Sequence, residues 1–141
     1  MTDGTRVTPG DASASLYRSA LGIRVIEAGE GRARVSMSHA DIVETFRREG
    51  IIHGGAVASL IDETAGVAVL SLQAAGEPPW VVTATADLNV SYLEAARTDL
   101  VAEARVLRAG RSLVFLQVDV RDAAETLVAT GRVTMFVRRE E

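Results

Sequence analysis

Residues 51–72, IIHGGAVASLIDETAGVAVLSL, are almost entirely apolar, yet Asp62 and Glu63 stand at their centre. The stretch predicts one long helix, and a helix that is apolar nearly all round must be covered on most sides. Burying an ionised carboxylate costs free energy unless the group is hydrogen-bonded or neutralised. Two acids in the middle of this helix therefore indicate a function. Gly54 lies eight residues and His53 nine residues before Asp62, where the helix is expected to begin.

The segments on either side of this helix are predicted to be strands. Residues 22–39 alternate between apolar and polar side chains and contain Gly-Glu-Gly at 29–31, which is typical of a hairpin turn. Beyond the helix, strands are expected over 80–93, 99–110, 112–122 and 126–137. The turns between them are short, so consecutive strands are expected to be antiparallel neighbours. With a short first helix capped by Asp11 or Ser13, the prediction is an α+β fold in which a curved antiparallel β-sheet wraps the long central helix.

The length of 141 residues fits one domain, predicted over residues 11–141 after a flexible leader over residues 1–10. The formal net charge of −4 argues against a nucleic-acid partner, because such proteins normally carry a basic surplus. The chain contains no cysteine, which excludes disulfides, thiolate catalysis and cysteine-type zinc sites. The N-terminus lacks the features of a signal peptide, and the glycines and central acids of 51–72 argue against a membrane span. We therefore expect a cytoplasmic protein without a membrane partner.

Three segments carry a resemblance to a known family: GIIHGGAVASLIDE at 50–63, TADLNVSYL at 85–93 and AGRSLVF at 109–115. On these segments the chain resembles the hotdog-fold thioesterases, and within them the PaaI-like acyl-CoA thioesterase group, over about residues 15–137. The resemblance implies a hotdog fold and a hydrolase that converts an acyl-CoA to a free acid and CoA without a cofactor or metal. It also implies a homodimer or a dimer of dimers with active sites between protomers.

The same resemblance assigns roles to residues of the helix and the following strand. The acid at Asp62 is expected to attack the thioester carbonyl or to activate a water that does so, while Glu63 could form an ion pair or serve as the base instead. The first N–H groups of a helix have no partner within it, so the Gly54 amide is predicted to stabilise the oxyanion. His53 is expected to hold the thioester or orient the helix start. Thr85 is expected to position the water.

Four further residues are predicted to contact the substrate. Gly55 follows Gly54 at the helix start, and Arg108 and Arg111 flank a turn from which their guanidinium groups could bind the CoA phosphates. Arg47 stands where relatives usually carry Asn or Gln in contact with the catalytic carboxylate or the water. An arginine there would pair with Asp62 and weaken it as a base.

Helix geometry adds a constraint on assembly. Eight residues along one helix separate Gly54 from Asp62 by about 12 Å, so the two cannot touch the same carbonyl. If both act, they must come from two chains, which agrees with the shared sites that the resemblance implies.

Two other functions are compatible with the sequence. One is a non-catalytic hotdog module that binds acyl-CoA. The other is a hotdog dehydratase or hydratase, although the spacing of nine residues between His53 and Asp62 points away from those enzymes. An aryl, phenylacetyl or medium-chain acyl group would fit a pocket lined by the small residues Ala56, Ala58, Ser59 and Gly66.

Overall fold

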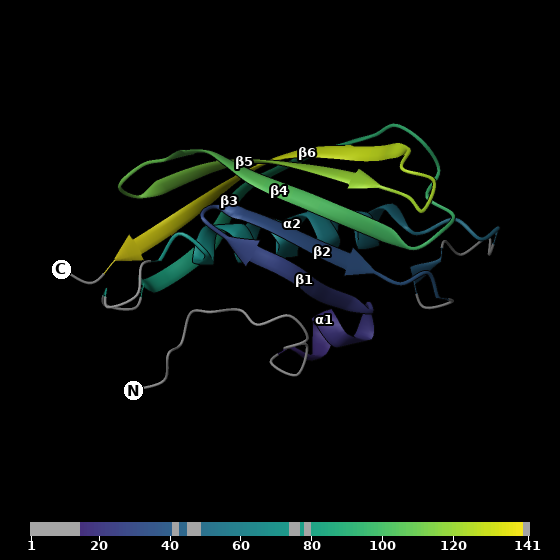
Figure 1. Cartoon of the computed structure of the whole chain (residues 1–141), viewed down its shortest axis with the longest axis horizontal. Coiled ribbons are helices and arrows are strands. Elements are labelled where there is room, and N and C mark those ends of the chain that lie inside the picture. The colour runs from purple at the N-terminus through teal and green to yellow at the C-terminus, as the bar shows by residue number, and fades with distance from the viewer. Residues whose placement is uncertain (1–14, 41–42, 45–48, 74–76, 78–79, 140–141) are drawn as a thin grey trace.

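Six antiparallel strands curve around one long helix (Figure 1). The structure is a computed structural model that describes residues 15–40, 43–44, 49–73, 77 and 80–139. Its elements are α1 (Leu16–Ala20), β1 (Ile23–Gly29), β2 (Arg32–Met37), α2 (Gly54–Leu70), β3 (Trp80–Tyr92), β4 (Leu100–Ala109), β5 (Leu113–Arg121) and β6 (Leu127–Arg139). This arrangement confirms the predicted α+β fold with a sheet wrapped around a central helix.

The N-terminal part of the prediction is only partly covered by the structure. The leader and the capping candidates Asp11 and Ser13 lie outside the described residues. The described helix α1 is capped by Ser15, whose side chain accepts a hydrogen bond from the N–H of Arg18. The predicted hairpin follows as β1 and β2, and its turn places Glu30 and Gly31 at φ values of 53° and 79°.

The core lies between α2 and the concave face of the sheet. Leu60 and Ile61 of α2 are fully buried against it, and so are alternate residues of the strands. Gly131 of β6 allows the close approach of the helix, since a Cβ there would lie 2.9 Å from Cγ2 of Ile61. No helix among the described residues is long and apolar enough to cross a membrane.

One side of α2 is not covered by the sheet. We call it the exposed stripe, and its members are partly or fully accessible: Gly55, Ala58, Ser59, Asp62, Glu63 and Gly66. These positions recur every three or four residues, so they share one side of the helix. Both acids of the helix lie on this stripe, which avoids the cost of burying them in the core.

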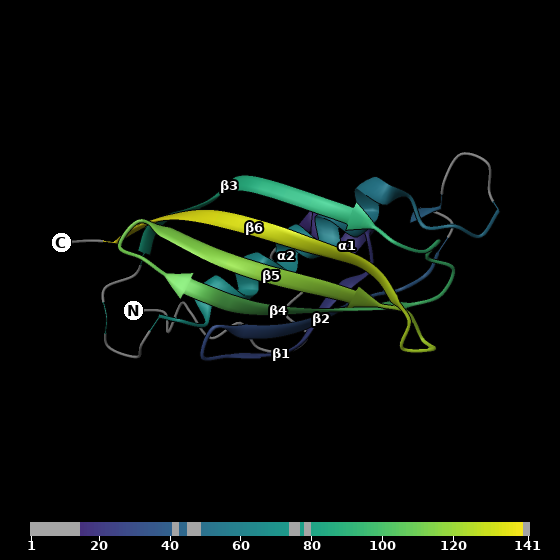
Figure 2. The ribbon, with the colours of Figure 1, turned by 90° about the horizontal axis from the view of Figure 1, so that it is seen from above.

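The strand order corrects one part of the prediction. The sheet runs β1-β2-β4-β5-β6-β3, so β3 pairs with β6 and is not a neighbour of β4. The link over residues 93–99 passes the start of α2, where the N–H of Ile52 donates to the carbonyl of Ala96 over 2.8 Å. A link of this length can reach more than about 20 Å when extended, so a short connection does not require adjacent strands. Seen from above, β3 and β1 form the two edges of the sheet (Figure 2).

Candidate active site

Asp62 is held by a residue of the edge strand β3. The hydroxyl of Thr85 donates a hydrogen bond to Oδ1 of Asp62 over 2.6 Å. Thr85 pairs with the buried Met135 of β6, so its side chain points to the helix side of the sheet. Within the described part of the chain, Oδ2 of Asp62 has no hydrogen-bond partner. The hydroxyl oxygen of Thr85 keeps its acceptor lone pairs, so both side chains can bind one water between them.

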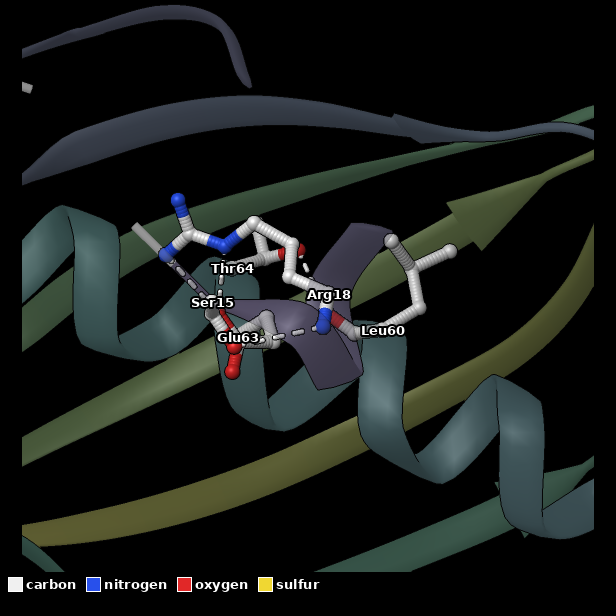
Figure 3. A network of polar contacts seen from close by, with 5 residues as sticks. All are labelled: Ser15, Arg18, Leu60, Glu63 and Thr64. Carbon is white, nitrogen blue, oxygen red and sulfur yellow. Dashed lines mark hydrogen bonds and ion pairs between the residues drawn. The ribbon is translucent and has the colours of Figure 1, made fainter. Parts of the chain in front are cut away.

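The neighbouring acid, Glu63, forms an ion pair with helix α1. Its Oε2 accepts hydrogen bonds from Nε and Nη2 of Arg18 over 3.0 and 2.9 Å. Figure 3 shows Arg18 reaching from α1 across α2 to this carboxylate. Of the two roles that the sequence left open to Glu63, the structure shows the ion pair. Asp62 is therefore the acid that faces β3.

Helix α1 makes a second polar contact with the exposed stripe. The hydroxyl of Tyr17 lies 2.6 Å from Oγ of Ser59. Ser59 donates its only hydroxyl proton to the carbonyl of Gly55 over 2.9 Å, so Tyr17 is the donor in the first contact. The sequence indicated no partner for Tyr17, because a contact between residues 42 positions apart has no local signature.

The start of α2 presents one free backbone donor. His53 is the N-cap, and its Nδ1 accepts from the N–H of Gly55 over 2.8 Å. Its carbonyl accepts from Ala56 and Val57 over 2.9 and 3.2 Å. Within the described residues, the N–H of Gly54 donates to no partner. It lies at the positive end of the helix dipole, where it can stabilise negative charge on a bound oxygen.

The cap also fixes the ring of His53. Because Nδ1 accepts a hydrogen bond, the neutral ring carries its proton on Nε2, which can donate to a ligand. A Cβ at Gly55 would lie 3.0 Å from Nδ1 of His53, so a glycine at this position makes room for the cap. The structure thus shows His53 orienting the helix start. Its contact with a thioester, and substrate contact by Gly55, stay predictions.

Tyr92 is a residue of the site that the sequence did not indicate. From the end of β3, its hydroxyl donates to the carbonyl of Gly54 over 2.6 Å. Its side chain is 55% exposed and lines a groove of about 440 Å³ beside the helix start. Most of the groove is apolar, with Ile51, Ile52, Val57, Leu93 and Val128 among its lining residues.

A comparison with known families decides the class of the protein. A family model described as the thioesterase superfamily matches residues 49–129, more than half of the chain. The chain belongs to the thioesterase superfamily. The matched range contains both Asp62 with Thr85 and the free N–H of Gly54, so the geometry above lies within the family's own segment.

Individual relatives of this thioesterase agree with that assignment. A Halobacterium salinarum protein named "Putative esterase" is 40% identical over 130 residues, which cover 87% of this chain and 85% of that protein. Human acyl-coenzyme A thioesterase 13 is 32% identical over 115 residues, covering 79% of this chain and 77% of the human protein. A solved structure of a conserved Pseudomonas aeruginosa protein is 31% identical, with a TM-score of 0.77, and covers 87% of this chain and 94% of that one. The predicted hotdog fold, family and class of thioester hydrolase are confirmed.

The predicted site residues of this thioesterase fall into two clusters on α2. The helix-start cluster is His53, Gly54, Gly55 and Tyr92, and the acid cluster is Asp62 and Thr85. About 12 Å of helix separates the two. One chain therefore does not bring the acid and the oxyanion donor to the same carbonyl. Among the described residues, no three His, Asp or Glu side chains gather as metal ligands.

The structure does not bring Arg108 or Arg111 to the acid cluster of its own chain. Arg108 pairs with Phe115, whose exposed side chain points away from the helix. Arg108 and Arg111 lie at the β4–β5 turn, three strand spacings or about 14 Å across the sheet from Thr85. Arg47 lies outside the described residues. Binding of CoA by these arginines stays a prediction.

Proposed function

We propose that this thioesterase hydrolyses an acyl-CoA to a free acid and CoA. Asp62 acts as the nucleophile or the general base, and the N–H of Gly54 receives the oxyanion. The observation that supports these roles most directly is the hydrogen bond from Thr85, which fixes one oxygen of Asp62 and leaves the other open to a water or a thioester. The human relative's name, acyl-coenzyme A thioesterase, supports a CoA ester as the substrate.

Two mechanisms are open to Asp62, and each accounts for the bonds formed and broken. As a general base, Asp62 takes a proton from a water beside Thr85, and the water oxygen bonds to the thioester carbon. The carbonyl oxygen becomes an oxyanion in front of the Gly54 N–H, the C–S bond breaks, and the CoA thiolate leaves with the electron pair. As a nucleophile, Asp62 itself bonds to the carbon, CoA leaves, and water then hydrolyses the mixed anhydride.

Strand β3 supports a dimer with shared sites. It is an edge strand of 13 residues in which Asp87 is the only charged residue. Leu88 and Tyr92 on its helix side are 38% and 55% exposed. A long edge strand with little charge is a template for pairing with another chain. The opposite edge, β1, has seven residues and carries Arg24 and Glu27, which makes it a poorer template (Figure 2).

Pairing of two β3 strands would join the two clusters. In an antiparallel pairing centred on Asn89, with the bulge between Thr85 and Asp87 counted as one extra residue, Thr85 of one protomer stands opposite the partner's Tyr92. Within each chain, Thr85 contacts Asp62 and Tyr92 contacts Gly54. Each active site would then combine the acid cluster of one protomer with the helix-start cluster of the other.

The groove beside the helix start supports an apolar acyl group. It borders Gly54, where the thioester carbonyl would bind, and its volume of about 440 Å³ is within the range of small-molecule sites. It differs from the pocket expected from the sequence. Ala56, one of the small residues expected there, is only 7% exposed, belongs to the core and is not among the lining residues of this groove. An aryl, phenylacetyl or medium-chain acyl group remains our proposal.

A thiol-release assay tests the proposed function. Aryl-, phenylacetyl- and straight-chain acyl-CoAs are supplied in turn, and free CoA is measured with a colorimetric thiol reagent. The chain has no cysteine, so the protein contributes no thiol signal. Enoyl-CoA hydration is followed in parallel. Thiol release that depends on Asp62 supports the proposal, while acyl-CoA binding without release would make the chain a binding module.

Removing the hydroxyl of Thr85 should lower turnover. Thr85→Val keeps the shape of the side chain and deletes the hydrogen bond to Asp62, so kcat should fall by about tenfold, as expected for losing a hydrogen bond to a charged group. Thr85→Ser, which keeps the hydroxyl, should retain most of the rate. Steady-state kinetics of both variants provide the measurement, and an unchanged kcat in Thr85→Val would exclude Thr85 from the reaction.

The paired substitution Arg108→Ala with Arg111→Ala should raise KM for acyl-CoA more than it lowers kcat. Phosphate contacts are equally present in the ground state and the transition state, so their loss weakens binding without slowing chemistry. The rise in KM with added salt should also be smaller in this variant than in the wild type. Arg24→Ala, which removes an exposed arginine of β1, is the control. An unchanged KM in the double variant would remove both arginines from the site.

A further inference from the structure

The peptide unit between Gly54 and Gly55 is held at both ends by side chains. Its carbonyl accepts a hydrogen bond from the hydroxyl of Tyr92 over 2.6 Å. Its N–H donates to Nδ1 of His53 over 2.8 Å. His53 is the adjacent cap, whereas Tyr92 comes from β3, 38 residues along the chain. The orientation of this peptide unit is therefore set from outside the helix.

The hydrogen bond from Tyr92 is not one that the helix needs. The groups left without partners at a helix start are its first N–H groups, whereas the carbonyl of Gly54 points into the helix. Tyr92 is also 55% exposed, so the side chain is not retained for burial in the core. A tyrosine outside the core of its own chain that binds this one carbonyl indicates a role in the geometry of the helix start.

That geometry matters for the oxyanion donor. The Gly54 N–H and the restrained carbonyl are joined through the Cα of a glycine, which is the residue with the greatest backbone freedom. The ring of Tyr92 lies against this Cα as well, since a Cβ there would be 3.3 Å from Cζ and from the hydroxyl oxygen. Oxyanion donors act through preorganisation, and small displacements reduce their effect.

We propose that Tyr92 is a positioning residue for the oxyanion donor, acting through the Gly54–Gly55 peptide unit of its own chain. This inference rests on the proposed function of the Gly54 N–H. Tyr92 orients that donor and takes no part in bond making. In the shared site, the donor that Tyr92 orients acts together with the catalytic acid of the partner protomer and not with Asp62 of its own chain.

The substitution Tyr92→Phe tests the role in the homodimer. It keeps the ring and removes only the hydroxyl, so kcat should fall about fivefold to tenfold, the change expected for one neutral hydrogen bond. KM should stay within about twofold, because an oxyanion contact is made mainly in the transition state. Tyr17→Phe is the matched control. It removes an equally short hydrogen bond to α2 that ends on the side chain of Ser59, and it should leave kcat within about twofold.

Two outcomes in the homodimer would overturn the proposal. The first is an unchanged kcat in Tyr92→Phe. The second is a loss of activity matched by a loss of thermal stability greater than that of Tyr17→Phe, which would indicate a merely structural role. Neither the kcat nor the thermal stability of Tyr92→Phe is measured in a variant of Asp62. Failure of the proposed acid, seen as an active Asp62→Asn enzyme, is therefore distinguishable from failure of this inference.

Heterodimers test whether Tyr92 acts in the site that contains Gly54 of its own chain. A dimer with one Asp62→Asn chain keeps one working site, which uses Gly54 of that same chain and the partner's Asp62. Placing Tyr92→Phe on the Asp62→Asn chain should lower the remaining activity about fivefold to tenfold, as in the homodimer. Placing it on the other chain should leave that activity unchanged. Equal effects in both placements would overturn the assignment.

Discussion

Asp62→Asn should lower turnover by at least about a hundredfold, the size expected for losing a nucleophile or a general base. The amide keeps the shape of the carboxylate and can still accept the hydrogen bond from Thr85, so the site should stay folded. What it loses is the negative charge that attacks the carbonyl or takes the proton from water. Single-turnover thiol release, measured beside the steady state, shows whether the chemical step itself is slowed.

Glu63→Gln is the control for this prediction. It removes a carboxylate one residue away that is paired with Arg18, and 26% of its side chain is exposed. A partly exposed ion pair stabilises a protein by about 1 kcal/mol or less, so Glu63→Gln should keep most of the activity and lose little stability. If Asp62→Asn retained the wild-type rate while Glu63→Gln lost it, the catalytic role would pass to Glu63.

Two inactive variants should restore activity when they form a heterodimer. One is Asp62→Asn, and the other is Gly54→Val, whose Cβ alone would lie 3.3 Å from Tyr92, so the added bulk should displace the helix start that carries the donor. In the heterodimer, one site carries both defects and the other carries neither. Activity per heterodimer should therefore reach about half that of the wild-type dimer, on the assumption of two-fold symmetry.

The heterodimer can be prepared by co-expressing the two chains with different affinity tags and purifying on both. Gly29→Val provides the control for a bulky residue at a glycine, since a Cβ at Gly29 meets no atom within 4 Å. That variant should be as active as the wild type. A purified heterodimer as inactive as its two parents would rule out active sites shared between protomers.

Local patterns in the sequence were sufficient for the elements of this fold. The apolar stretch 51–72 contains the observed helix Gly54–Leu70, and the predicted strand 99–110 is observed as Leu100–Ala109. Helix and strand periodicity depend on neighbours within a few residues, which the sequence shows directly. The spacing of Gly54 and Asp62 likewise follows from helix geometry alone, and it was enough to indicate a site built from two chains.

The tertiary structure decided which side chains meet. Counting back along β3 from Tyr92 by strict alternation would turn Ala86 and Ala84 toward the helix and Thr85 away from it. A bulge between Thr85 and Asp87 shifts the register by one residue, so that Thr85 faces α2 and reaches Asp62. No local pattern in the sequence marks this bulge, because it arises in the pairing of β3 with β6.

The same reason explains the other contacts that the sequence did not indicate. Tyr92 meets Gly54 only because β3 lies at the sheet edge beside the helix, an order that the short 93–99 link did not reveal. Arg18 meets Glu63 because α1 lies over α2 (Figure 3). The sequence by itself determined the elements, the family and the candidate acid. Packing between elements far apart in the chain determined how that acid is held, since strand order and register are properties of the assembled sheet.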